Sequence, residues 1–232
     1  MMRCARIDLG GMVVVMLFFL VASAEAALID RGSGFIYDDV QDITWAQNGN
    51  INGSDTWANQ VAWAAGYSQT HTVYGTFDDW RLPTVTDTGA SGCDYAYTGT
   101  DCGYNVDTST GEMASLFYDS LGNLAFYDTS GNSPQSGWGL THTGPFTNLQ
   151  SYYYWHDFAP NKDLSGISWV SIVGMGSGTI ASIGTGDNNT NLYALAVHDG
   201  DIVASVVPIP AAVWLFGSGL GLLGWIRRRK AA

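Results

Sequence analysis

The chain has 232 residues, with 21 acidic and 9 basic residues, 13% charged residues, 29 glycines and 9 tryptophans. This length fits one medium domain with small additions, and so many aromatic residues argue against a disordered chain. The net charge of −12 excludes a typical nucleic-acid-binding protein, because phosphate recognition requires Lys and Arg. We therefore expect a loop-rich globular domain with no nucleic-acid partner.

The first 26 residues have the pattern of a secretory signal peptide. Arg3 and Arg6 precede an apolar run at 12–21, and Ala24 and Ala26 provide small residues at the positions that signal peptidase reads. The apolar run is short for a membrane span. We expect cleavage near residue 26, with signal peptidase as a processing partner.

Residues 208–232 have the pattern of a membrane segment with a basic tail. The 19 residues from 208 to 226 carry no charge, and a helix of that length, at about 1.5 Å per residue, nearly crosses the hydrocarbon core. Cationic tails stay on the cytoplasmic side, so we expect the body of the chain on the other side of the inner membrane, in the periplasm. We predict a transmembrane helix at 209–226 and a basic tail at 227–230, formed by Arg227, Arg228, Arg229 and Lys230.

This C-terminal segment resembles the PEP-CTERM sorting signal of Gram-negative bacteria. Pro208 and Pro210 stand where that signal has Pro-Glu-Pro, and the apolar helix and basic tail follow at once. The resemblance implies processing by an exosortase, a membrane cysteine protease. It also implies that the precursor is anchored in the inner membrane, and that the exported mature protein reaches the cell surface or the biofilm matrix.

The region between the two signals, residues 27–207, is strongly acidic. It has three cations and 19 acids, a net charge of −16, and 18 of the acids are Asp. Asp favours turns and helix caps, so a soluble loop-rich surface accounts for these residues. Calcium bound by loop carboxylates is the alternative, although no EF-hand loop or glycine-rich Asp repeat is present. We expect no obligatory cofactor, with calcium possible.

Cys93 and Cys102 are the two cysteines of this region. An even pair in an oxidising compartment favours a disulfide. The alternative is a metal site, which two cysteines without a nearby pair of His residues form poorly. We predict a disulfide between them.

The patterning of the region predicts two short helices among short strands. A hairpin is expected from 28–30 and 35–37, and a third strand at 43–45. The first helix is expected to run from a cap at Ser54 or Asp55 to residue 65, and the second over 112–121 from a cap at Ser109 or Thr110. Later strands are expected at 152–155, 167–173, 179–183, 192–197 and 202–206. This order predicts an α+β fold with a twisted, mostly antiparallel sheet.

Several landmarks in chain order resemble the Lcl C-terminal domain family, a domain of unknown function. They are Leu-Ile-Asp-Arg-Gly-Ser-Gly at 28–34, Ile-Thr-Trp at 43–45, Thr-Trp-Ala at 56–58, Asp-Trp-Arg-Leu-Pro-Thr at 79–84, and Tyr-Ala-Leu-Ala-Val-His-Asp-Gly-Asp at 193–201. The resemblance implies a C-type-lectin-like fold for residues 27–207, related to that of formylglycine-generating enzymes. We do not carry over the activity of those enzymes, because Cys93 and Cys102 do not match their copper-binding cysteines.

The most specific landmark is the motif Trp80, Arg81, Leu82 and Pro83. In the family an acidic helix start directly follows this motif, whereas here residues 85–107 intervene. We expect Trp80 and Leu82 to point inward and Pro83 to end the strand. We expect Arg81 to form a buried or half-buried pair with an Asp, and anion binding is the alternative role.

No catalytic motif is recognisable, and the four His residues lack metal-site spacing. The best candidate for binding is the aromatic segment 152–158. Alternation in a strand places Tyr153, Trp155 and Asp157 on one face, where flat rings and a carboxylate suit a sugar, and Asn161 follows. The alternative is that both faces are core.

The sequence therefore predicts an exported protein with a non-catalytic domain that binds carbohydrate or matrix, as in adhesion. Two alternatives stay open. One is an exported hydrolase of polysaccharides, with a carboxylate pair hidden among the acids. The other is a structural matrix component with no discrete ligand.

Overall fold

The structure is a computed structural model, and it describes residues 28–89, 95–158, 169–184 and 190–203. The signal peptide, the C-terminal segment from residue 208, Cys93 and Asn161 lie outside these residues, so their assignments stay predictions. Within the described part of the chain, no helix is long and apolar enough to cross a membrane.

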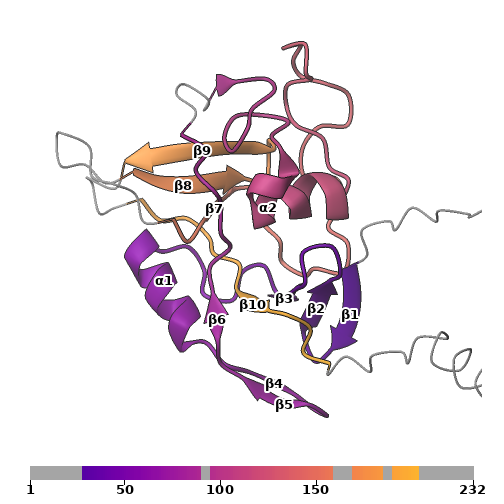
Figure 1. The fold of residues 1–232 in the computed structure, drawn as a ribbon, viewed down its shortest axis with the longest axis vertical. Coiled ribbons are helices and arrows are strands. Elements are labelled where there is room, and N and C mark those ends of the chain that lie inside the picture. The colour runs from indigo at the N-terminus through magenta and orange to yellow at the C-terminus, as the bar shows by residue number, and fades with distance from the viewer. Residues whose placement is uncertain (1–27, 90–94, 159–168, 185–189, 204–232) are drawn as a thin grey trace, which may run out of the picture.

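The described residues form two antiparallel sheets, a separate hairpin and short helices (Figure 1). The larger sheet has the order β1-β2-β3-β10-β6, from β1 (Leu28–Gly32), β2 (Phe35–Asp38), β3 (Ile43–Ala46), β10 (Val197–Asp199) and β6 (Trp80–Arg81). The smaller sheet has the order β7-β8-β9, from β7 (Tyr153–Trp155), β8 (Trp169–Gly174) and β9 (Thr179–Gly184). The hairpin pairs β4 (Gln69–His71) with β5 (Gly75–Phe77).

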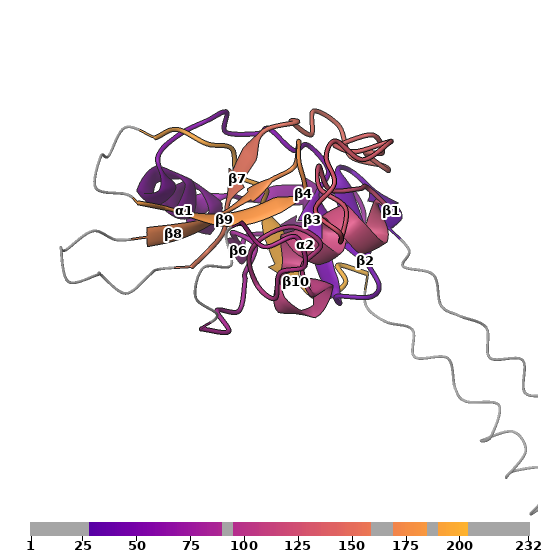
Figure 2. The same cartoon turned by 90° about the horizontal axis from the view of Figure 1, so that it is seen from above.

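Two short helical segments accompany the sheets and lie far apart in both views (Figures 1 and 2). They are α1 (Trp57–Gly66), and α2 (Glu112–Ser115) with the 3-10 turn η2 (Thr108–Thr110) before it and the π-helical turn η3 (Leu116–Ser120) after it. The prediction of an α+β fold with two short helices and mostly antiparallel sheets is confirmed.

The predicted first hairpin is present, and its turn explains the sequence there. Gly32, Ser33 and Gly34 all have positive φ values, of 79°, 53° and 87°. Glycine adopts this conformation without steric cost, so two glycines in three residues suit the turn. The same segment shifts the register of β1 against β2.

The predicted caps of both helices are wrong. Thr56 caps α1, and its hydroxyl accepts a 3.4 Å hydrogen bond from the Asn59 N–H. Asp55 instead exchanges two backbone hydrogen bonds with Leu192, each 3.0 Å long. Gly111 occupies the N-cap of α2, because the expected cap residues Ser109 and Thr110 belong to η2.

The predicted strand at 192–197 is also wrong. Leu192 and Tyr193 form single bridges to two different elements, at Asp55 and Tyr154, and regular pairing begins only at Val197. The residues between them are buried. An apolar run that passes through the core cannot be distinguished from a strand by its composition.

β10 brings the end of the described chain against its beginning. It lies between β3 and β6, and just beyond it Asp201 pairs with Arg31 of β1 through a 3.1 Å bond to Nε and a 2.5 Å bond to Nη2. The core beneath the larger sheet includes Ile36, Trp45 and Val197. These contacts hold the first and last parts of the described chain next to each other.

Candidate functional site

The Trp80–Pro83 motif is part of the scaffold, as expected. Trp80 and Leu82 are buried in two different apolar clusters, and the Pro83 carbonyl accepts a 2.7 Å hydrogen bond from the Asp157 N–H. The motif therefore ties the larger sheet to the segment that follows β7.

Arg81 is the charged centre of this motif. Its Nη1 and Nη2 donate to the two carboxylate oxygens of Glu112 at 2.8 and 2.7 Å. Its Nε and Nη2 donate to Asp199 at 3.1 and 2.5 Å. The expected pair with an Asp is present, but the two-point partner is Glu112, which the sequence did not indicate. These carboxylates raise the pKa of Arg81 despite its partial burial, so it stays charged.

Glu112 is the first residue of α2 and also binds the residue that follows the motif. The Thr84 N–H donates to its carboxylate at 2.7 Å, and its own N–H donates to the Thr84 carbonyl at 3.1 Å. Val85 and Gly111 form a bridge between these segments. We call residues 85–107 the insertion. Its two ends are joined by these contacts, which place Glu112 next to the end of the Trp80–Pro83 motif.

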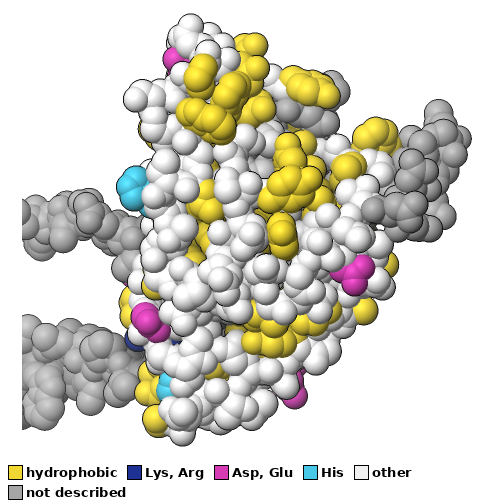
Figure 3. Space-filling model, turned by 180° about the vertical axis from the view of Figure 1, so that it is seen from behind, with side chains coloured by type: hydrophobic (Ala, Val, Ile, Leu, Met, Phe, Trp, Pro, Cys, Tyr) yellow, Lys and Arg dark blue, Asp and Glu magenta, His cyan; other side chains and the backbone are white. Residues whose placement is uncertain are grey.

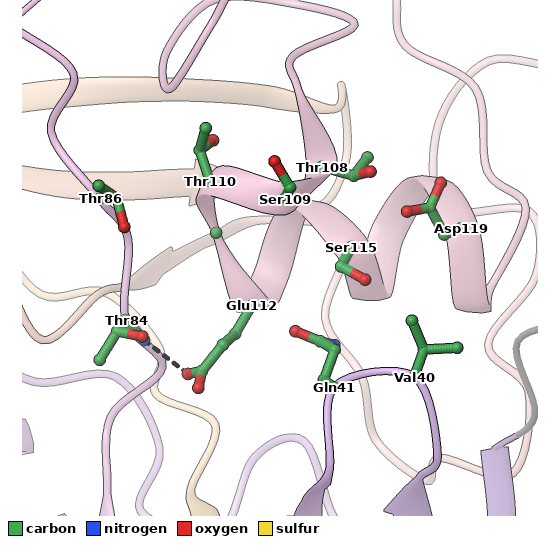
Figure 4. A pocket seen from close by; sticks show the side chains of 11 residues that line it. Val40, Gln41, Thr84, Thr86, Thr108, Ser109, Thr110, Glu112, Ser115 and Asp119 are labelled. Atoms are coloured by element: carbon green, nitrogen blue, oxygen red, sulfur yellow. Dashed lines mark hydrogen bonds between the residues drawn. The ribbon is translucent and has the colours of Figure 1, made fainter.

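A pocket of about 410 Å³ lies above this closed base (Figure 4). Its walls carry mostly hydroxyl groups, from Thr84, Thr86, Thr108, Ser109, Thr110 and Ser115, together with Gln41, Glu112 and Asp119. Val40 is its one large apolar side chain. The Glu112 carboxylate is already bound by Arg81 and Thr84, which gives it a structural role. We call this the hydroxyl pocket.

A second pocket, also of about 410 Å³, has a different lining. It is lined by four tyrosines, by four apolar residues and by three residues with hydroxyls: Tyr95, Tyr104, Tyr152, Tyr153, Ile172, Ala181, Ile183, Leu192, Thr179, Ser182 and Thr190. We call this the tyrosine pocket. Tyr95 and Tyr152 are 85% and 53% exposed, so their rings are available to a ligand.

The register of the smaller sheet explains the position of the tyrosine pocket. Trp155, Ile172 and Ala181 are cross-strand partners and so share one face, and Tyr153 pairs with Gly174 on that same face. This face packs with residues of α1 in one apolar cluster. Its partly buried members Tyr153, Ala181 and Ile183 also line the pocket.

The predicted binding residues do not form one site. Tyr153 lines the tyrosine pocket. Trp155 is 1% exposed in the core, and its indole N–H donates to the Asp55 carbonyl at 2.9 Å, so it cannot contact a ligand. Asp157 is exposed but does not line the pocket, and Asn161 lies outside the described residues.

Two tyrosines of the pocket, Tyr95 and Tyr104, were missed by sequence reasoning, whereas Tyr152 belongs to the candidate segment 152–158 but was not among the predicted binding residues. Tyr152 lies one residue before β7, so the alternation of that strand does not determine which way its side chain faces. Tyr95 and Tyr104 come from the insertion, where aromatic residues in a polar segment were the available signal. The Tyr104 ring lies 4.9 Å from that of Tyr127, which holds it in place. Burial raises the pKa of the Tyr104 phenol, so this group is an O–H donor at neutral pH.

Cys102 and His156 both have structural surroundings. Cys102 is disulfide-bonded, but its pairing with Cys93 stays a prediction. In the described ranges no group of three or more His, Cys, Asp or Glu side chains could hold a metal ion. His156 is fully buried beside Ser171, with Nδ1 and Oγ 2.8 Å apart, and has a structural environment.

One face of the molecule carries several separate apolar patches (Figure 3). Figure 3 shows hydrophobic side chains gathered in separate patches, with few charged groups between them. Comparison with protein-family models, with curated proteins and with solved structures finds no match. The resemblances to the Lcl C-terminal domain and to the PEP-CTERM signal therefore stay predictions.

Proposed function

We propose that this chain is an exported protein of the cell surface or biofilm matrix, whose 27–207 region binds carbohydrate without catalysing a reaction. The tyrosine pocket is the observation that supports this function. A lectin-like arrangement of the domain, implied by the family resemblance, belongs to the same proposal.

The lining of the tyrosine pocket suits a sugar. Ligand sites combine apolar and aromatic walls with a few polar groups, and a flat aromatic ring stacks on the C–H face of a pyranose. The tyrosine and threonine hydroxyls can donate and accept hydrogen bonds, as sugar hydroxyls do. The hydroxyl pocket has no aromatic ring, so it offers less for stacking.

Export rests on the two terminal signals. The leader directs secretion, and the C-terminal helix with its basic tail holds the precursor in the inner membrane until an exosortase acts. Intact mass of the native protein from its own host tests this route. A mass that begins near residue 27 and ends near Pro208 supports it, whereas a mass that retains 209–230 in the inner-membrane fraction contradicts it.

Carbohydrate binding is tested with the full chain, purified in mild detergent and incubated with a panel of polysaccharides, with and without calcium. We expect Tyr152→Ala to weaken binding about tenfold, which corresponds to about 1.4 kcal/mol. Tyr74→Ala is the matched control, because Tyr74 is 47% exposed but lies outside the pocket. Equal loss in both variants, or no binding to any polysaccharide, would contradict the proposal.

A further inference from the structure

We infer that the tyrosine pocket takes an uncharged glycan and discriminates against polysaccharides built from uronic acids. This inference rests on the proposed function, and it adds the chemical class of the ligand. Two observations carry it: the described residues of the lining have no charged side chain, and the described cations are paired elsewhere. The arrangement of the rings adds support for a sugar ligand.

The polar side chains that the described residues contribute to the pocket all end in hydroxyls. They are the phenols of four tyrosines and the side chains of Thr179, Ser182 and Thr190. Hydroxyls both donate and accept, so they match the hydroxyls of a neutral sugar without a charge on either side. A carboxylate that entered the pocket would lose hydration and gain no cationic partner, which is costly.

The cations of the described residues are already paired. Arg31 binds Asp201, and Arg81 binds Glu112 and Asp199. Neither arginine lines the tyrosine pocket. The net charge of −16 over residues 27–207 adds repulsion of any polyanion that approaches the surface. Among the described residues, an anionic polymer therefore meets no compensating cationic side chain at this site.

The rings at the pocket form a corner. The Tyr152 and Tyr153 rings of the lining lie 5.4 Å apart at an angle of 75°. A sugar stacked on one ring is then flanked by the edge of the next. Such a corner can contact the C–H face of a sugar ring, and this contact requires no ion pair.

The test uses polymers that differ only in charge. The full chain is titrated with neutral β-1,4-glucan, mannan and galactan oligomers, each paired with its C6-carboxylate counterpart, in about 0.15 M salt, at which ionic interactions reach about 8 Å. We expect at least one neutral oligomer to bind at least tenfold more tightly than its uronate. We also expect Tyr152→Ala to weaken this binding about tenfold.

A designed charge provides the second readout. Ser182→Lys puts a cation at the wall of the pocket, and we expect it to raise uronate affinity at least fivefold. Ser130→Lys is the control, because Ser130 is exposed outside the pocket, and we expect no such gain. Uronates that bind the unmodified chain as tightly as their neutral partners would overturn the inference but leave carbohydrate binding standing. Failure of every oligomer to bind would overturn both.

Discussion

Arg81 and Glu112 are 31 residues apart and form a two-point ion pair across the base of the insertion. Their side chains are 27% and 15% exposed, whereas Asp199, which also contacts Arg81, is 78% exposed. The pair is therefore partly protected from water. It connects the Trp80–Pro83 motif to the start of α2, and so holds both ends of the insertion.

The first prediction concerns this pair. We expect Glu112→Gln to lower the free energy of unfolding by about 1–3 kcal/mol, because it leaves the Arg81 guanidinium half-buried with one carboxylate fewer. Urea unfolding of the full chain in mild detergent, followed by tryptophan fluorescence, measures this loss. Asp199→Asn is the control, and we expect it to cost at most about 1 kcal/mol because exposed pairs contribute little. Equal costs would contradict the role given to Glu112.

Local signals predicted much of the framework. The hairpin of β1 and β2, strand β3, both helical segments, and β7 to β9 were expected at nearly their observed positions. Each has either a turn with glycine or a clear apolar periodicity, such as Trp57 and Val61 on α1. The inward positions of Trp80 and Leu82 followed from alternation alone.

The parts that were missed depend on contacts distant in sequence. Glu112 looked like an ordinary helix residue, because nothing local shows that residues 85–111 close on themselves. Trp155 and Tyr153 share a face, but only the position of α1 decides that one is core and the other lines a pocket. Tyr95 and Tyr104 reach that pocket from an insertion whose path is set by tertiary packing.

The second prediction concerns Asp38, a fully buried carboxylate of β2. It accepts hydrogen bonds from the Val40 and Gln41 N–H groups, the Gln41 side-chain amide, the Trp45 indole and the Ser120 hydroxyl, at 2.9 to 3.4 Å. We expect Asp38→Asn to cost about 2–3 kcal/mol, because one amide NH₂ would face these donors.

Asp78→Asn is the control for this variant, because Asp78 is exposed and surface changes usually stay within about 0.5 kcal/mol. Chemical unfolding of the two variants beside the unmodified chain provides the comparison. An Asp38 variant as stable as the Asp78 variant would show that the five donors find other partners.

The third prediction separates backbone strain from crowding. Gly178 and Gly200 have similar positive φ values, of 71° and 76°. A Cβ at Gly178 would lie 2.8 Å from the Phe117 ring and 3.0 Å from the backbone of Ala125, whereas a Cβ at Gly200 has open space. We expect Gly200→Ala to cost about 1 kcal/mol and Gly178→Ala at least about 1 kcal/mol more, from overpacking. Thermal unfolding of both variants measures the difference, and equal shifts would contradict the crowding at Gly178.

The fourth prediction is a pH dependence of stability that originates at His156. Burial lowers the pKa of His156 to about 3, against about 6.5 in an unfolded chain. The unfolded state therefore binds a proton that the folded state excludes. The contribution of His156 to the free energy of unfolding is fully present above about pH 6.5 and is lost as the pH falls from there towards about 3.

Comparison with a variant isolates this contribution from the titration of the many carboxylates. We expect the free energy of unfolding of the unmodified chain to fall, relative to that of His156→Gln, by up to about 1.4 kcal/mol per pH unit below pH 6, because glutamine does not titrate. His142→Gln is the matched control, since His142 is exposed, and its pH profile should stay parallel to that of the unmodified chain. Urea unfolding at pH 7.5, 6.0 and 5.0 provides the data. A His156→Gln profile parallel to the unmodified one would show that the buried ring does not control acid sensitivity.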